Sequence, residues 1–116
     1  MQKQNKIYNS ITRDNMKQHL VFLTGKLAKI SLEKVLSDMS SKNEFTYEVQ
    51  DIGVNVAALA TIDIIMQKIS PNFSKNTTKI IIPGRCRGNI KELSKYFGKE
   101  CIRGPEELKD IPVFLG

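Results

Sequence analysis

The sequence predicts an α/β fold, a small three-layer parallel sheet of about four strands with helices on both faces, of the Rossmann-like or flavodoxin-like kind. Two observations lead to this fold class. Short apolar runs end at glycine, as buried strands do, and segments with the apolar spacing of a helix face follow them. The connections between these segments are only a few residues long, which favours crossover helices between parallel strands.

Composition is consistent with one domain. The chain has 116 residues, of which 41% are hydrophobic and 26% are charged, and this size suits a single core. Residues 1–17 are rich in Gln, Asn, Lys and Ser, and they are predicted to form a flexible, basic N-terminal extension before an α/β domain over residues 18–116. A long apolar run and a signal-peptide core are both absent from the sequence, so we expect a cytoplasmic protein without a membrane segment.

The first strand is predicted over residues 19–24, a short apolar run that ends at Gly25. Ser31 is the predicted N-cap of the helix that follows. The apolar residues of that helix recur at i, i+3, i+4 and i+7, which is one buried stripe. They are Leu32, Val35, Leu36 and Met39.

The second strand is predicted from residue 45 to the glycine at position 53, because apolar and polar residues alternate from Phe45 through Val49. The next helix is predicted over residues 56–69 with Asn55 as its cap, and Pro71 follows its end. Apolar residues cover most of its circumference, so it is expected to be deeply packed or shared with a partner.

The third unit begins with the β-branched run Ile80-Ile81-Ile82, which stops at Pro83-Gly84. A helix with apolar positions Ile90, Leu93 and Phe97 comes next, with Asn89 at its N-cap and Gly98 at its left-handed C-terminal position. A short strand is predicted around residues 101–102. A last short helix is predicted to start at Pro105.

Parallel sheets of this kind bind ligands beyond the carboxyl ends of their strands. Four loops occupy that position, at residues 24–26, 51–53, 83–89 and 103–105. Each loop contains glycine, and three of the loops contain Lys or Arg. These cations could bind an anion together with the free N–H groups at the start of a helix. The predicted ligand-binding residues are Thr24, Gly25, Lys26, Asp51, Gly53, Gly84, Arg85, Arg87, Gly88, Asn89, Arg103 and Gly104. The alternative is that these glycines only turn the chain and the cations only contact solvent.

Weak candidates for a catalytic group are Cys86 and Asp63. Cys86 lies between two arginines near a helix start, which could lower the pKa of its thiol, but His19 is at the opposite edge of the sheet and cannot act as its base. Asp63 interrupts an apolar segment, so burial would oblige it to find a partner, and a hydrogen bond to a loop arginine is expected. Cys86 and Cys101 lack the spacing of a zinc site or disulfide framework, and no metal site is predicted.

Known cofactor motifs are also missing. The sequence has neither GxxxxGK followed by Ser or Thr nor GxGxxG after the first strand, which disfavours ATP hydrolysis and NAD binding and leaves the cofactor undetermined. The net charge of +6 and pI near 9.4 suggest nucleic acid as a partner. Most cations alternate with acids, however, and no aromatic platform is present, so nucleic acid is not the favoured partner.

Two segments together form a motif that is specific enough to suggest a family. They are Pro-Gly-Arg-Cys-Arg-Gly at residues 83–88 and Gly-Pro-Glu-Glu-Leu-Lys-Asp at residues 104–110. Together with residues 22–28, 45–53 and 56–63, they make the chain from 19 to 116 resemble the N-terminal domain, itself of undefined function, of dihydropteroate-synthase-related proteins linked to tetrahydromethanopterin one-carbon metabolism. The chain departs from that pattern at Lys26 and Asn89, where the family usually has Arg and Asp.

The resemblance implies that a pterin-binding (β/α)8 barrel would follow, and the 116 residues are too few to include a barrel of about 250 residues. We therefore expect a detached domain, a fragment or a standalone relative. The favoured function is a noncatalytic accessory or ligand-binding domain for an anionic metabolite, phosphorylated or carboxylated and of the pterin pathway. The partner would be a pterin-binding barrel. Alternatives are a small enzyme of pterin and one-carbon metabolism and a structural domain that forms homo-oligomers.

Overall fold

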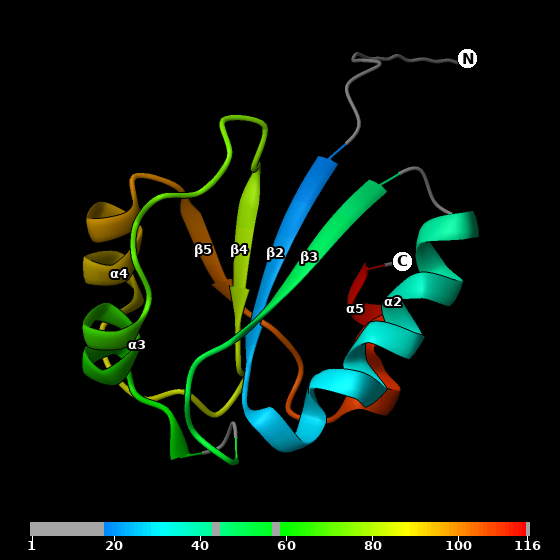
Figure 1. The fold of residues 1–116 in the computed structure, drawn as a ribbon, viewed down its shortest axis with the longest axis horizontal. Helices are drawn as coiled ribbons and strands as arrows, with labels where there is room; N and C mark the ends of the chain where they lie inside the picture. The colour runs from blue at the N-terminus through cyan, green and yellow to red at the C-terminus, as the bar shows by residue number, and fades with distance from the viewer. Residues whose placement is uncertain (1–17, 43–44, 57–58, 116) are drawn as a thin grey trace.

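The computed structural model describes residues 18–42, 45–56 and 59–115, so the predicted extension over residues 1–17 lies outside the described residues. The fold is the α/β sheet that the sequence predicts (Figure 1). Four parallel strands lie in the order β3-β2-β4-β5, with β2 at Gln18–Thr24, β3 at Phe45–Asp51, β4 at Lys79–Ile82 and β5 at Glu100–Arg103.

Helices cover both faces of the sheet (Figure 1). On one side lie α3 and α4, and on the other lie α2 and α5, with a 3-10 turn before each of the latter two. The bounds are η1 Lys26–Ala28, α2 Lys29–Lys42, α3 Ile62–Lys68, α4 Ile90–Phe97, η3 Leu108–Asp110 and α5 Ile111–Leu115. None of the helices in these ranges is long and apolar enough to cross a membrane.

The sheet reverses its winding between β2 and β4. Strand β2 pairs with β3 on one side, from Gln18 opposite Phe45 to Thr24 opposite Asp51. On its other side β2 pairs with β4, with Leu20 opposite Lys79. The chain therefore leaves the end of β2 toward one edge of the sheet and leaves the end of β4 toward the other. This is a topological switch point, where the two departing loops diverge and leave space between them.

Alternating residues of the central strands build two apolar cores. Val21, Leu23, Ile80 and Ile82 belong to the cluster with α3 and α4. The second cluster has Leu20, Phe22 and Ile81 from the sheet, with Leu32 and Leu36 from α2 and Ile111 from α5. Because successive strand side chains point to opposite faces, the continuous apolar runs of β2 and β4 are what a sheet covered on both sides requires.

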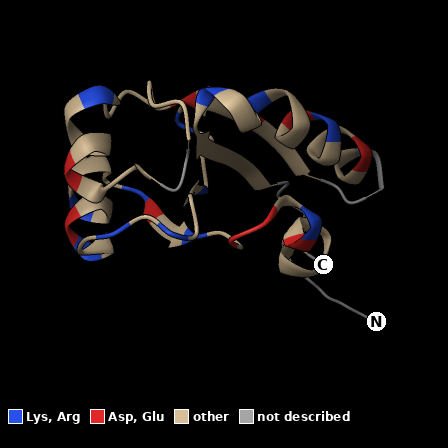
Figure 2. Cartoon of the chain, turned by 90° about the horizontal axis from the view of Figure 1, so that it is seen from below, with Lys and Arg blue, Asp and Glu red and all other residues tan. Residues whose placement is uncertain are grey.

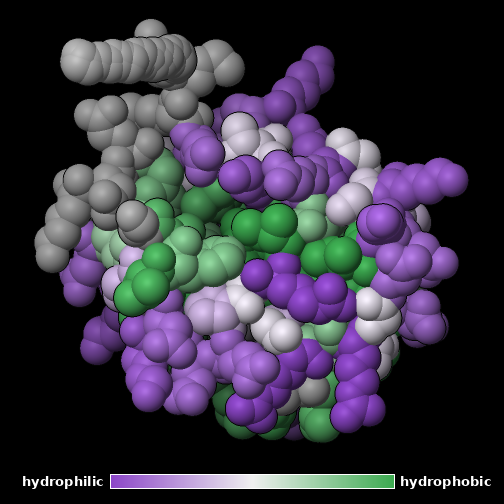
Figure 3. Space-filling view, turned by 180° about the vertical axis from the view of Figure 1, so that it is seen from behind, coloured by the Kyte–Doolittle hydropathy of each residue, from purple (hydrophilic) through white to green (hydrophobic). Residues whose placement is uncertain are grey.

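The predicted stripe on α2 is confirmed, since Leu32 and Leu36 are buried and both Val35 and Met39 pack against them. The helices bury the edge of the sheet less completely than its centre, and Ile102 on the edge strand β5 is only partly buried. Seen from the side opposite to Figure 1, apolar side chains reach the surface across the middle of the molecule, with polar residues above and below them (Figure 3).

The helix predicted over residues 56–69 is shorter than expected. It begins at Ile62, and Thr61 caps it by accepting a hydrogen bond from the N–H of Ile64 at 3.2 Å, so the prediction of Asn55 as the cap is wrong. The carbonyls of Val54 and Asn55 instead accept hydrogen bonds from the N–H groups of Lys26 and Leu27 in η1, at 2.8 and 3.1 Å. These contacts with a distant segment hold the chain outside a helix there.

Two other helix starts differ from the prediction. Helix α2 begins at Lys29, ahead of the predicted cap Ser31, because η1 already turns the chain. The last helical segment begins at Leu108 with Glu107 at its N-cap, and not at Pro105. Residues 104–106 pass closely over the end of β4 and are not free to coil. Asn89 and Gly98 do cap α4, as predicted, and Gly98 has a φ of 67°.

Candidate functional site

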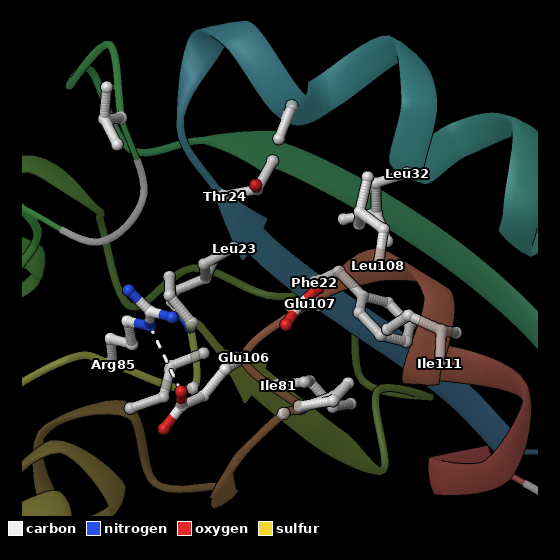
Figure 4. A pocket seen from close by; sticks show the side chains of 17 residues that line it. Phe22, Leu23, Thr24, Leu32, Ile81, Arg85, Glu106, Glu107, Leu108 and Ile111 are labelled. Carbon is white, nitrogen blue, oxygen red and sulfur yellow. Dashed lines mark hydrogen bonds and ion pairs between the residues drawn. The ribbon is translucent and has the colours of Figure 1, made fainter.

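A pocket of about 350 Å³ opens beyond the carboxyl ends of β2 and β4, at the switch point of the sheet (Figure 4). Its walls come from the ends of both strands, from the start of α2 and from the segment between β5 and α5. Most of the lining is apolar. The lining residues are Phe22, Leu23, Thr24, Ala28, Leu32, Val56, Ile81, Ile82, Pro83, Gly84, Arg85, Gly104, Pro105, Glu106, Glu107, Leu108 and Ile111.

Two glycines bring the walls of this pocket together. A Cβ added at Gly84 would lie 2.5 Å from the carbonyl oxygen of Gly104, and one added at Gly104 would lie 2.9 Å from Cγ2 of Ile81. Only glycine allows the loop after β4 to contact the loop after β5 through backbone alone. In the structure these two residues pack the loops against each other, whatever they also offer to a ligand.

The charged groups at the pocket have both signs. The Nε atom of Arg85 donates to Oε1 of Glu106 at 3.2 Å, and both side chains are exposed. Glu107 follows in the lining, and its Oε1 lies 3.8 Å from Nζ of Lys109. Figure 2, a view onto the carboxyl ends of the strands, shows this acidic segment leading into η3 and α5. The expectation of a basic crevice therefore needs revision, because Arg85 shares the lining with two carboxylates.

Thr24 places a hydroxyl on the apolar wall. Its exposed fraction is 5%, and its carbonyl oxygen accepts from the N–H of Ile52 at 2.8 Å, which fixes the backbone at the end of β2. Within residues 18–42, 45–56 and 59–115, no group forms a hydrogen bond with its side-chain hydroxyl. Buried hydroxyls are normally paired with protein, water or ligand. Thr24 thus offers a donor and an acceptor to whatever fills the pocket.

The other arginines of the predicted site are turned elsewhere. The guanidinium of Arg103 donates to the carbonyl of Cys86 at 3.0 Å and to that of Gly88 at 2.7 Å, so it holds the loop between β4 and α4 in place. Arg87 is exposed and lines a separate hollow of about 180 Å³ with Leu59, Ala60 and Thr61. Neither arginine belongs to the lining of the larger pocket.

The helix start at α4, predicted to offer free N–H groups, is capped by its own chain. Oδ1 of Asn89 accepts from the N–H of Lys91 at 3.0 Å, and its carbonyl accepts from that of Glu92 at 3.1 Å. Gly88, at a φ of 124°, lies so close to Ile62 that an added Cβ would be 2.8 Å from the Ile62 Cβ. This part of the loop therefore packs against α3 and α4 on the other side of the sheet.

The remaining predicted residues lie around the ends of β2 and β3. Gly25 is buried, and Lys26 is exposed with its N–H bonded to Val54. Oδ1 of Asp51 accepts from the N–H of Gly53 at 2.7 Å, which closes a local turn. Neither these residues nor Gly88 and Asn89 line the larger pocket, so the structure brings Thr24, Gly84, Arg85 and Gly104 together there and separates the others.

The catalytic candidates do not line this pocket either. Cys86 is buried, and burial raises the pKa of its thiol, with the nearby charge of Arg103 acting in the opposite, lowering direction. The expected lowering by neighbouring arginines is therefore outweighed by desolvation. Asp63 is exposed in the first turn of α3, where the helix dipole favours an acid, so it is not the buried carboxylate that the prediction assumed. The described residues contain no group of three or more His, Cys, Asp and Glu that could hold a metal ion.

Several lining residues were missed from the sequence. Glu106 and Glu107 were assigned to the first turn of a helix, although their position directly after the Gly-Pro that follows β5 could have marked them as strand-end residues. The apolar lining residues, such as Phe22 and Ile81, have a sequence pattern that predicts only core residues. What distinguishes these lining residues from ordinary core residues is a position near the strand ends, on the face of the sheet that α2 covers. Recognising that position requires the order of the strands in the sheet.

A family model matches residues 18–106 of this chain. The chain belongs to a family of unknown function, DUF6513. The matched range contains all four strands and the pocket residues from Phe22 to Glu106, whereas Glu107, Leu108 and Ile111 lie just beyond it.

The DUF6513 domain also has a curated relative, the "Uncharacterized protein MJ0107" of Methanocaldococcus jannaschii, which is 27% identical over 103 residues. The alignment covers 83% of this chain but 19% of the relative, so the chain spans about a fifth of the length of that protein. No solved structure matches the chain.

Proposed function

We propose that this DUF6513 domain is a noncatalytic binding module for a small metabolite with a flat, apolar body and a carboxylate or phosphate group. The observation that carries the proposal is the position of the 350 Å³ pocket, at the switch point of a parallel sheet with Arg85 at its edge. Doubly wound sheets bind their ligands at this place, and ligand pockets typically combine apolar walls with a few polar groups.

Arg85 is the anchor for the acidic group of the ligand. Its contact with Glu106 joins two exposed side chains, with side-chain exposures of 58% and 62%. Exposed pairs of this kind contribute little, about 0–1 kcal/mol. A ligand carboxylate or phosphate can therefore replace Glu106 at low cost and use the planar fork of the guanidinium. The apolar side chains of Phe22, Leu32 and Leu108 would cover the body of the ligand.

The ligand that we propose to test first is a pterin-pathway carboxylate. This choice rests on the resemblance to the N-terminal domains of dihydropteroate-synthase-related proteins. The relative from M. jannaschii supports an accessory role, since the aligned region is a minor part of a much longer chain. In this proposal the domain would bind or deliver its ligand beside a pterin-binding barrel.

The test is calorimetric titration with pterin-6-carboxylate and, separately, with 4-aminobenzoate. We expect Arg85→Gln to weaken binding about tenfold to a hundredfold, because a hydrogen bond to a charged group contributes about 1.5–3 kcal/mol. The matched control is Arg87→Gln, which changes the same residue type in the same loop but outside the pocket. The control should bind as the unmodified chain does.

Two results would contradict the proposal. Equal binding by Arg85→Gln would remove the anchor, and a loss confined to Arg87→Gln would move the site to the smaller hollow beside Thr61. The enzyme alternative gains no support from the pocket, because its candidates Cys86 and Asp63 do not line it.

A second candidate function, self-association, is favoured by exposed apolar side chains. Leu27 and Ile30 are each 74% exposed and Leu59 is 70% exposed, beside the half-exposed Val56. Backbone hydrogen bonds join Leu27 to Asn55 and Leu59 to Val56, which brings the segments that carry these exposed side chains together. Monomeric proteins rarely expose apolar patches of more than a few hundred Å².

Sedimentation velocity across a hundredfold range of concentration would test self-association. A dimer that dissociates in Leu27→Glu but persists in the control Val113→Glu would support this function; Val113 is 84% exposed and lies on α5. A monomer at every concentration would count against it.

A further inference from the structure

We propose that the pocket at the switch point selects ligands with an amidine-like edge, that is, two adjacent N–H donors, received by the carboxylate of Glu107 and the hydroxyl of Thr24. This inference rests on the proposed function, because it describes the second recognition element of the same ligand. The acidic group at Arg85 would bring a ligand to the pocket, and the donor edge would decide which ligand stays.

The first supporting observation is Thr24. Its side chain is 95% buried in an apolar wall, since its exposed fraction is 5%, and the described residues supply no hydrogen-bond partner for its hydroxyl. An unpaired buried polar group costs free energy, so it marks a position where a polar ligand atom belongs. Figure 4 shows the Thr24 oxygen on the wall of the pocket, with the Glu107 carboxylate facing the same space.

The second observation is the charge balance of the lining. Arg85 is paired with Glu106, which leaves the carboxylate of Glu107 as the additional charge. Nζ of Lys109 lies 3.8 Å from Oε1 of Glu107, and both side chains are largely exposed, so this pair is weak. A carboxylate only accepts hydrogen bonds, and it accepts one from a charged N–H donor strongly. A ligand with acceptors at this edge would face repulsion instead.

Glu107 is free to take this role structurally. It occupies the N-cap position of η3 but makes no capping hydrogen bond through its side chain. The change Glu107→Gln therefore removes the charge without removing a helix cap. Glu92→Gln is the matched control, because Glu92 is an exposed acid in the first turn of α4, away from the pocket lining.

The experiment compares two benzoates of similar shape by protein-observed NMR titration. The probe 4-amidinobenzoate has the two NH2 donor groups of a cationic amidinium where 4-acetylbenzoate has an oxygen and a methyl group. The unmodified chain should bind the amidine about tenfold more tightly, as one charge-assisted interaction predicts. Glu107→Gln should abolish this preference, Thr24→Val should reduce it, and Glu92→Gln should keep it.

The outcomes separate this inference from the proposed function. Equal affinity for the two probes, with both weakened by Arg85→Gln, would overturn the donor-edge inference and leave the anchor intact. A preference that Glu107→Gln removes while Arg85→Gln changes nothing would support the donor edge and overturn the anchor. If the unmodified chain does not bind the amidine probe, or if the preference survives in Glu107→Gln, the inference is wrong.

Discussion

Arg103 should stabilise the domain through the loop that carries Arg85. Its guanidinium donates to two backbone carbonyls, at 3.0 Å to Cys86 and at 2.7 Å to Gly88, and so joins the end of β5 to the loop after β4. The substitution Arg103→Met keeps most of the aliphatic stem and removes both donors. Two carbonyls then lose their partner, and the loop loses its connection to β5.

The expected cost follows from these two bonds. A hydrogen bond from a charged donor contributes about 1.5–3 kcal/mol, and the full amount applies only where water cannot replace it. The bond to Cys86 is partly buried, whereas the one to Gly88 is exposed and water can take its place. Together they should contribute about 2–3 kcal/mol to the free energy of unfolding.

Urea denaturation followed by circular dichroism measures this change. With an m-value of about 1–1.5 kcal/mol per M for a domain of this size, the midpoint should fall by about 2 M at unchanged m. Arg87→Met is the control, because the Arg87 side chain has no hydrogen bond or ion pair within the described ranges, and its midpoint should move little. Equal midpoints for the two variants would refute the assignment of Arg103 as the residue that holds the loop.

Three further predictions concern stability. Gly84→Ala should cost about 1–3 kcal/mol in a thermal melt, since its Cβ would meet backbone at 2.5 Å, and a melting temperature equal to that of the unmodified chain would refute the contact. Asn89→Ala should cost about 1 kcal/mol by removing the cap of α4, measured in the same melt, and an unchanged melting temperature would contradict the cap. Burial raises the pKa of both Cys86 and Cys101 in the folded state. In the unfolded chain the thiols ionise at about pH 8.5. Below that pH they should not affect the free energy of unfolding, and above it the free energy of unfolding should fall. Urea midpoints measured across that pH range should fall less in a variant with alanine at both positions, and an identical fall would refute the prediction.

The sequence alone predicted the sheet and much of its helical cover. The apolar runs of β2 and β4, the buried stripe of α2 and the caps Asn89 and Gly98 were all read correctly. Each of these signals depends on a few neighbouring residues and on the period of a strand or helix, so no knowledge of distant contacts is needed. The general location of the candidate site followed from the same pattern, because parallel strands end at a common edge.

Only the tertiary structure decided which residues meet at that edge. Long-range bonds from η1 to Val54 and Asn55 delayed the start of α3, and the pairing of β4 with β5 directed Arg103 onto backbone carbonyls. The sequence suggested one basic crevice. The fold instead places Arg85 beside Glu106 in an apolar pocket, with Thr24 in its wall, and puts Arg87 in a separate hollow with Thr61. Strand order and the direction of each loop produce this separation, and residues far apart in the chain determine both.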